Sequence, residues 1–255
     1  MARTTKAAKV AKRAVLALAT LALIAVVGVV GFLSVGQMGP GAAAEAALEG
    51  SEKVEVTWLD QRTVVFSPAN KPKNQRGLVF YQGAKVEATA YAPLLAALAE
   101  EGWTCVTADA PLNFAMTDAD AAARLIPRIN GVSRWYVGGH SFGGFVSAQY
   151  AAAHADQVEG LVLLGSYANA DISDSGLNVI TIHGTNDLVC SQEKFEADLP
   201  NLPASAHVLQ LQGGNHAQFG NYGKQDHDND ASITADDQQQ QAVNTIISFL
   251  TNVSA

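Results

Sequence analysis

Cysteine is scarce in this chain, which excludes two kinds of structure. The 255 residues contain only two cysteines, Cys105 and Cys190. Two distant cysteines form neither the spacing of a metal site nor the framework of a disulfide-rich domain, so no metal site is predicted. Cys105 falls in a predicted strand and Cys190 follows a loop, so we expect two unreactive thiols. A single bridge between them stays open if the domain is exported.

Basic residues are also few once the first part of the chain is set aside. Five of the sixteen lysines and arginines precede residue 14, and residues 1–36 contain no Asp or Glu. The remainder therefore holds eleven basic against twenty-four acidic residues, a balance of −13. A domain this acidic, without a basic patch, is poorly suited to phosphate backbones. Nucleic acid is excluded as a partner.

Charge of either sign is missing from residues 14–35, which read AVLALATLALIAVVGVVGFLSV. As a helix, these twenty-two residues would span about 33 Å, enough to cross a bilayer core. The apolar core of a signal peptide is shorter, about 7–15 residues. The sequence therefore predicts an uncleaved transmembrane anchor. The small residues of Pro40 to Ala47 could serve as a cleavage site, so a cleaved signal peptide stays the alternative.

The charges on either side of this apolar segment predict its orientation. Residues 1–13 carry five cations, and the next Lys or Arg after the apolar run is Lys53. By the positive-inside rule, residues 1–13 lie in the cytoplasm and the globular part lies on the extracytoplasmic side of the cell membrane. Residues 36–52 are rich in small residues and are expected to form a linker. The folded domain is then expected over residues 53–253.

The predicted domain alternates short apolar runs with segments of helical periodicity. Strands are expected at 53–59, 62–68, 77–83, 104–111, 134–139, 158–167, 177–184 and 207–213. Helices are expected at 89–103, 117–129 with a kink at Pro127, 142–154, 191–199 and 233–253. The first two strands read as a pair. The alternation predicts an α/β fold with a mostly parallel central sheet and helices on both faces.

One serine stands among glycines between a predicted strand and a predicted helix, in the stretch YVGGHSFGG. A strand that turns directly into a helix puts this residue, Ser141, into a strained backbone region, and the residues two before and two after must be small. Those positions are Gly139 and Gly143. The pattern is that of a nucleophile elbow, with Ser141 as the candidate nucleophile.

A serine hydroxyl needs a general base, and the base needs a carboxylate that orients it. In a sheet of this kind the chain order should be serine, acid, histidine. Asp187 follows a predicted strand in IHGTNDLVC, and His216 follows the last strand in LQGGNHAQFG. Carboxyl ends of parallel strands meet at one edge of a sheet, so we expect both side chains near Ser141. Asp171, Asp174 and Asp109 remain alternative acids.

The other histidines are expected to have packing or surface roles. His183 ends a predicted strand, His207 begins one, and His154 ends a helix. His140 precedes the serine, and its side chain is expected to point away from the reacting groups.

Two backbone N–H groups are expected to stabilise an oxyanion. The residue after the nucleophile, Phe142, provides one of them, and the loop between an early strand and the first helix provides the other. In the loop YQGAKV the small residues Gly83 and Ala84 allow the backbone to approach closely, so the Ala84 N–H is the predicted second donor.

Three aspartates at alternate positions, Asp226, Asp228 and Asp230, look like part of a calcium-binding loop. The loop requires glycine at its sixth position, which is Ala231 here, and a glutamate at its end, which is missing. A solvated acidic loop is expected instead.

The four ordered motifs YQGAKVEATAYAPLLAALAEEGW, VGGHSFGG, HGTNDLV and GGNHAQFG resemble the α/β-hydrolase superfamily. The chain is most similar to the branch called α/β-hydrolase family 5, which is related in fold to dienelactone hydrolases. This resemblance implies a Ser141–Asp187–His216 triad with oxyanion donors at Phe142 and Ala84. Dienelactone hydrolases carry cysteine as nucleophile, and this chain has serine there. About ten residues, 168–177, stand where many relatives insert a lid, so no sizeable lid is expected.

These observations predict a membrane-anchored serine hydrolase that acts on a small-molecule acyl substrate, an ester or thioester, without a metal or organic cofactor. A peptidase or acyltransferase with the same triad is one alternative. A non-catalytic α/β-hydrolase domain that serves as a binding module is the other. The sequence leaves the oligomeric state open.

Overall fold

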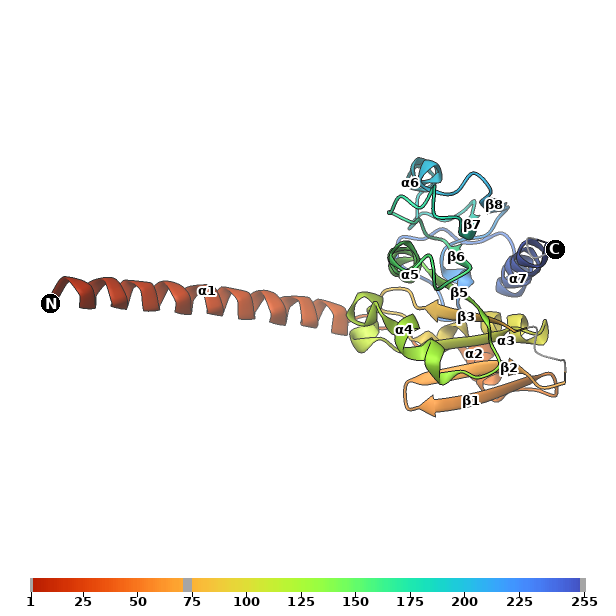
Figure 1. The fold of residues 1–255 in the computed structure, drawn as a ribbon, viewed down its shortest axis with the longest axis horizontal. Coiled ribbons are helices and arrows are strands. Elements are labelled where there is room, and N and C mark those ends of the chain that lie inside the picture. The colour runs from red at the N-terminus through yellow and green to blue at the C-terminus, as the bar shows by residue number, and fades with distance from the viewer. Residues whose placement is uncertain (1, 71–74, 253–255) are drawn as a thin grey trace. The chain divides into compact units, whose positions relative to one another are not determined.

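The computed structural model describes residues 2–70 and 75–252 of the chain. The outer limits of the predicted segments, residues 1 and 253, lie outside the described residues. Helices and strands carry the labels of Figure 1, numbered along the chain.

By its internal contacts the chain divides into two units, which begin at Met1 and Met38. The first unit contains helix α1 (Ala2–Ser34), which includes residues 14–34 of the apolar run predicted at 14–35. Within α1, Val10–Ser34 is long and apolar enough to cross a membrane, with a mean hydropathy of 2.7. Length and composition of this kind are common to membrane anchors and signal sequences.

The second unit is built on an eight-stranded sheet with the order β1-β2-β4-β3-β5-β6-β7-β8. The strands are β1 (Val54–Asp60), β2 (Thr63–Pro68), β3 (Arg76–Tyr81), β4 (Thr104–Ala108), β5 (Arg134–His140), β6 (Gly160–Leu164), β7 (Asn178–Gly184) and β8 (His207–Leu211). β1 pairs with β2 and β2 with β4 in antiparallel register, and all other neighbours are parallel. The predicted fold class, an α/β domain with a mostly parallel sheet, is confirmed.

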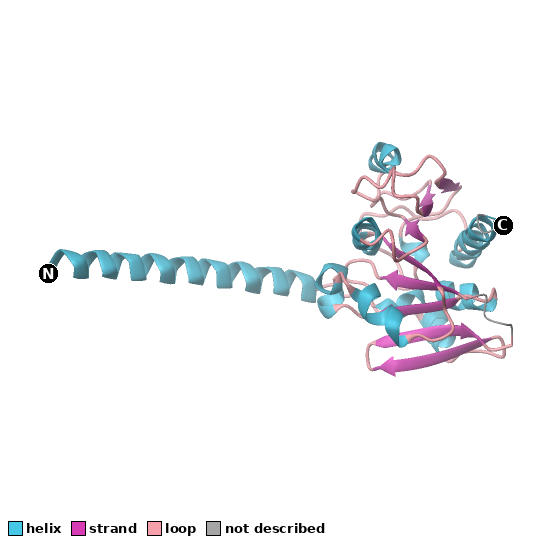
Figure 2. Cartoon of the chain, viewed as in Figure 1, coloured by secondary structure: helices cyan, strands magenta, loops and turns pink. Residues whose placement is uncertain are grey.

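Helices cover both faces of the sheet, as Figure 2 shows in cyan around the magenta strands. They are α2 (Ala42–Leu48), α3 (Ala92–Glu100), α4 (Ala121–Leu125), α5 (Phe142–Ala153), α6 (Gln192–Asp198) and α7 (Ala235–Asn252). Apolar residues of α3 and α7 form one core cluster, and those of α4 and α5 form another. The neighbours Leu78 and Val79 on β3 belong to opposite clusters, because successive strand residues point to opposite faces. Central strands buried on both faces explain the continuous apolar runs in the sequence.

Residues 36–52 differ from the predicted linker. Helix α2 forms there, and its residue Ala44 has no exposed surface. Asn221 holds this segment through two hydrogen bonds. Its backbone carbonyl accepts the Gly41 N–H at 2.7 Å, and its side-chain oxygen accepts the Ala44 N–H at 3.2 Å. Met38 pairs with Val86 in a short parallel bridge. Small residues that resemble a linker in sequence therefore pack closely against the domain, which begins at about Met38 in the structure.

The helix predicted at 117–129 is divided. A 3-10 turn at Ala115–Asp118 precedes α4, which ends at Leu125, and a second 3-10 turn covers Ile126–Arg128. Pro127 lacks an N–H and cannot continue an α-helix, so the predicted kink is a break.

The parallel strands bring distant parts of the chain to one edge of the sheet. β5, β6, β7 and β8 run in the same direction, so their carboxyl ends lie along that edge. Ser141 directly follows β5. The loops that contain Asp187 and His216 follow β7 and β8. The topology thus accounts for how residues 75 positions apart in sequence meet.

Candidate active site

Ser141 occupies the turn between β5 and α5 in a strained conformation, with φ 53° and ψ −124°. Positive φ is uncommon for residues other than glycine, and such strain is found at functional sites. Hydrogen bonds hold the turn in place: the Ser141 N–H donates to the Leu164 carbonyl at 3.0 Å, and the Ser166 hydroxyl donates to the Ser141 carbonyl at 2.7 Å.

The glycines around Ser141 are there because the backbone leaves no room for a side chain. A Cβ at Gly143 would lie 2.1 Å from the Tyr81 carbonyl oxygen and 2.4 Å from that of Gln82. A Cβ at Gly139 would lie 2.5 Å from the backbone of Gly143. The small residues that the elbow pattern requires are thus explained by close contact between the first turn of α5 and the end of β3.

Asp187 and His216 form a buried pair. Their shortest contact joins His216 Nδ1 to Asp187 Oδ2 at 2.8 Å, and both side chains are almost fully buried. The other carboxylate oxygen, Oδ1, accepts the backbone N–H groups of Val189 at 2.9 Å and Cys190 at 2.8 Å. A carboxylate only accepts hydrogen bonds, so Nδ1 is the protonated ring nitrogen and Nε2 carries the free lone pair.

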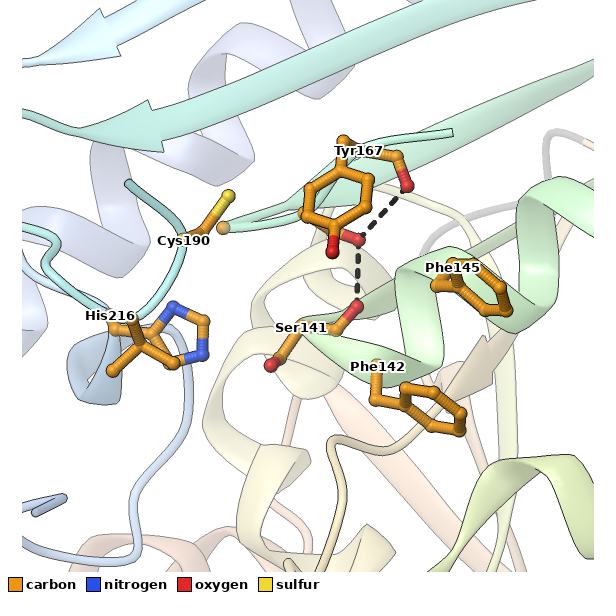
Figure 3. A pocket seen from close by; sticks show the side chains of 9 residues that line it. Ser141, Phe142, Phe145, Tyr167, Cys190 and His216 are labelled. Carbon is orange, nitrogen blue, oxygen red and sulfur yellow. Dashed lines mark hydrogen bonds between the residues drawn. The ribbon is translucent and has the colours of Figure 1, made fainter. Parts of the chain in front are cut away.

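Ser141 and His216 line the same pocket of about 190 Å³. Figure 3 shows the Ser141 side chain pointing toward the His216 ring. The Nε2 atom of His216 is buried and has no hydrogen-bond partner among the described residues. A basic nitrogen that faces a serine without another partner is suited to remove the hydroxyl proton. The remaining walls are mostly apolar and include Phe142, Phe145 and Tyr167.

The two predicted oxyanion donors lie on facing segments. Phe142 begins α5, so its N–H has no acceptor within the helix. In the loop after β3, the Gly83 N–H donates to the Tyr91 hydroxyl at 3.0 Å and the Lys85 N–H donates to the Asn113 carbonyl at 2.7 Å. Within the described part of the chain, no hydrogen bond uses the N–H of Ala84. Ala84 is not among the residues that line the pocket.

The alternative acids lie apart from His216. Asp171 accepts the N–H and hydroxyl of Ser173 in an exposed turn. Asp109 accepts the Ala88 N–H, and burial raises the pKa of its carboxyl. Asp174 is exposed. Of the four candidates, Asp187 is the one that the structure places against His216.

Three of the other histidines keep the packing roles expected of them. His154 contacts the Tyr150 carbonyl through Nδ1, and His207 stacks on Phe249. His183 stacks on Phe195, and its Nδ1 lies 3.9 Å from Asp187 Oδ2, beyond hydrogen-bond distance.

His140 lies closer to the reacting groups than the sequence indicates. Its ring packs on His216 with 4.4 Å between ring centroids, and its Nδ1 lies 2.9 Å from the Tyr91 hydroxyl. The Tyr91 oxygen also accepts the Gly83 N–H at 3.0 Å, so this hydroxyl joins the loop after β3 to His140. Burial, and then the nearby His216, hold the pKa of His140 well below its usual value, so this ring is neutral.

Cys190 also lines the pocket, and no motif in the sequence indicates this position. Its side chain is nearly buried, and burial raises the pKa of its thiol to about 12. A thiol with that pKa is neutral at physiological pH and a weak nucleophile. Both cysteines are free and buried, as expected for unreactive thiols. Ser141 is therefore the hydroxyl or thiol best placed for nucleophilic attack at this pocket.

Solved structures with the same fold include several hydrolases. An alpha/beta hydrolase enzyme from the metagenome of lagoon sediments at Mar Chica, Morocco, has 13% identity and a TM-score of 0.57, over 79% of this chain and 100% of its own. An alpha-beta serine hydrolase homologue from Coxiella burnetii has 14% identity and a TM-score of 0.54, over 77% and 98%. A cold-adapted esterase from an Arctic intertidal metagenomic library has 14% identity and a TM-score of 0.53, over 77% and 92%.

At these identities the likeness establishes the fold. No curated protein sequence matches the chain. A family profile decides the assignment: the one described as "Alpha/beta hydrolase family" matches residues 77–241, more than half of the chain, and this range includes the elbow, the acid and the histidine. The chain therefore belongs to the alpha/beta hydrolase family.

Proposed function

We propose that this protein is a serine hydrolase that cleaves carboxylic esters or thioesters. One observation carries the proposal: the 2.8 Å contact between Asp187 and His216 beside a pocket that His216 shares with Ser141. This arrangement combines a nucleophile in a strained turn, a base with a free lone pair and a buried carboxylate that orients the base. Esterases among the structural neighbours support the ester assignment by analogy.

The reaction takes place in two steps. Ser141 Oγ attacks the carbonyl carbon while His216 Nε2 takes the hydroxyl proton, and the Asp187 carboxylate stabilises the imidazolium. The N–H of Phe142, which lines the pocket, holds the oxyanion, with the Ala84 N–H of the loop after β3 as the proposed second donor. The leaving alkoxide or thiolate receives the proton from His216. Water then attacks the acyl-enzyme with His216 as base, which releases the acid and restores the serine.

The size of the pocket favours a small acyl or aryl group. Its walls include Phe142, Phe145 and Tyr167, and its volume is about 190 Å³. An apolar cavity of about 150 Å³ holds a benzene molecule. The pocket therefore suits a group of about one ring or a short alkyl chain.

We further propose that α1 anchors the enzyme, with its N-terminus in the cytoplasm and the domain on the extracytoplasmic side. The support is a helical segment, Val10–Ser34, of sufficient length and hydropathy, preceded in the sequence by basic residues.

A fluorophosphonate probe tests the catalytic proposal on the full-length chain in detergent. The probe phosphonylates activated serines, so we expect labelling of the parent and none of Ser141→Ala. Ser205→Ala, which changes an exposed serine, is the matched control and should label as the parent does. Peptide mapping should place the adduct on Ser141 rather than on Ser166, the other serine of the pocket. A folded parent that does not label would contradict the proposal.

Substrate panels then define the reaction. Short acyl esters should react faster than long ones if the pocket volume limits the acyl group. Faster consumption of the ester when an amine or alcohol acceptor is added would identify an acyltransferase instead of a hydrolase.

A further inference from the structure

The loop between β8 and α7 contains a short segment, residues 228–230, that contacts both the acid loop and the histidine loop. The half-buried side chain of Asp228 makes the first contacts. Its Oδ2 accepts the N–H of Ala217 at 2.9 Å, and its Oδ1 accepts the N–H of Leu188 at 3.3 Å. Ala217 directly follows His216, and Leu188 directly follows Asp187. One carboxylate thus joins the residues that follow the two members of the pair.

The backbone of the same segment contacts the residues that precede the pair. The side chain of Asn186 donates to the Asp230 carbonyl at 3.1 Å. The side chain of Asn215 donates to the Asn229 carbonyl at 2.7 Å. Asn186 directly precedes Asp187, and Asn215 directly precedes His216. Residues 228–230 therefore bond to both sequence neighbours of Asp187 and to both sequence neighbours of His216.

We infer that residues 228–230 form a clamp that holds Asp187 and His216 at the separation their hydrogen bond needs. The two residues stand on separate loops, after β7 and after β8, and the Asn186 N–H donates to the Gly214 carbonyl at 2.8 Å on the side that precedes both residues. A 2.8 Å contact between side chains of separate loops is sensitive to small movements of either loop. Residues 228–230 bond to the residues on both sides of Asp187 and on both sides of His216, which limits movement of both loops. Reactive side chains need this kind of support from surrounding hydrogen bonds.

Asp228 is accordingly a positioning residue, since it acts through the Asp187–His216 pair. The inference explains why an aspartate of a mostly exposed acidic loop turns inward. The Asp230 side chain, in contrast, is 82% exposed and pairs with Lys224, which is 87% exposed. The kinetic test of this inference measures ester hydrolysis, so it rests on the proposed esterase function.

The test compares Asp228→Ala with Asp230→Ala in the full-length chain held in detergent micelles. Both changes remove one carboxylate from the same loop, but Asp230→Ala keeps the backbone carbonyl that Asn186 contacts. We expect Asp228→Ala to lower kcat for a short acyl ester by about tenfold or more, because small displacements of reacting groups are costly. KM should change less than kcat, because the apolar walls Phe142, Phe145 and Tyr167 are not altered. Asp230→Ala should keep the parent kcat.

A second readout follows the pair without any substrate. The proton on His216 Nδ1, held in a charge-assisted hydrogen bond, should give a far-downfield proton resonance. This signal should weaken or disappear in Asp228→Ala and persist in Asp230→Ala. If Asp228→Ala does not fold, Asp228→Asn and Asn186→Ala provide the same comparison, since each removes part of the clamp.

The outcomes separate this inference from the proposed function. A folded Asp228→Ala with the parent kcat and the parent resonance overturns the clamp, even if its melting temperature falls, because its role is then only structural. A parent that neither labels nor hydrolyses esters overturns the proposed function. In that case the resonance, compared between Asp228→Ala and Asp230→Ala, still decides the clamp.

Discussion

At the scale of single residues, His140 affects the site through its protonation state. Its ring is 1% exposed and packs on His216. Its Nδ1 forms a 2.9 Å hydrogen bond with the Tyr91 hydroxyl, and burial holds its pKa well below the usual value, so the ring is neutral. A second positive charge beside His216 would oppose the imidazolium that the proposed mechanism requires. The chain from the Gly83 N–H through Tyr91 to His140 thus ties the predicted oxyanion loop to the candidate base.

The lowered pKa of His140 predicts how stability depends on pH. Below about pH 6.5 the unfolded chain binds a proton at this residue that the folded chain does not bind. Its contribution to stability is therefore complete above that pH and is lost as the pH falls toward the lowered folded pKa. We expect a loss of about 1.4 kcal/mol per pH unit from this residue. Chemical unfolding of the parent and His140→Gln, between about pH 7.5 and 5.5, measures it.

The comparison uses the slope of stability against pH, since the substitution also changes contacts. Burial also lowers the pKa of His183, so the stability of His140→Gln should still fall with pH, but with a smaller slope than that of the parent. Identical slopes in the two proteins would mean that His140 is not held neutral.

Gly143 provides a second residue-scale prediction. A Cβ there would lie 2.1 Å from a backbone oxygen of β3, and neither the strand nor α5 can move easily. We expect Gly143→Ala to reduce stability by about 3 kcal/mol or more through overpacking. Thermal unfolding measures the loss. Gly39→Ala is the control, because its Cβ would meet a flexible Glu87 side chain at 3.5 Å. Equal melting temperatures of the two variants would refute the steric explanation of the elbow.

The sequence predicted residues whose chemistry follows from local pattern. Ser141 stands in a short glycine pattern, and Asp187 and His216 follow strands in the expected order, so the pair that the structure brings together could be selected. Asp228 could not, because its partners Leu188 and Ala217 lie 40 and 11 residues away. The sequence predicts a packing role for His140, but the ring that it packs on, His216, lies 76 residues further along the chain.

At the scale of elements, α2 belongs to the folded domain. Its sequence, AAAEAAL, favours a helix. The sequence is equally typical of a linker, because Pro40 and Gly41 precede α2 and the helix itself has mostly small side chains. Only tertiary contacts distinguish a packed helix from a free linker, and the buried Ala44 makes such contacts. The order of the strands in the sheet could not be predicted either. The apolar runs show which segments are strands, but not which strands pair, because paired strands can be far apart in sequence.

The buried position of Ala44 leads to a prediction about this element. Ala44→Leu should lower stability by about 1–3 kcal/mol, because the added atoms must enter a closely packed region. Ala43→Leu, one position away on the exposed side of α2, should have little effect. Chemical unfolding of the two variants compares them. If residues 36–52 were a free linker, neither substitution would change stability.

At the scale of the whole molecule, α2 bears on whether the N-terminal segment is cleaved. The small residues that could serve as a cleavage site lie between Pro40 and Ala47. Cleavage there would remove the Met38–Val86 bridge and separate the chain within or just before α2. A mature domain that begins in this range would lose contacts that the folded unit makes. The packing therefore supports the proposal that α1 is an anchor that remains attached.

An attached anchor gives the last prediction. Full-length protein expressed in a bacterium should stay with the membrane after an alkaline wash, and its intact mass should include the N-terminal segment. A variant without residues 14–35 should be soluble, because the apolar helix supplies the membrane affinity. Protease added to spheroplasts should reach the domain of the full-length protein if the positive-inside orientation holds. A soluble product whose first residue lies between Pro40 and Ala47 would instead establish a cleaved signal peptide, and protection from the protease would reverse the orientation.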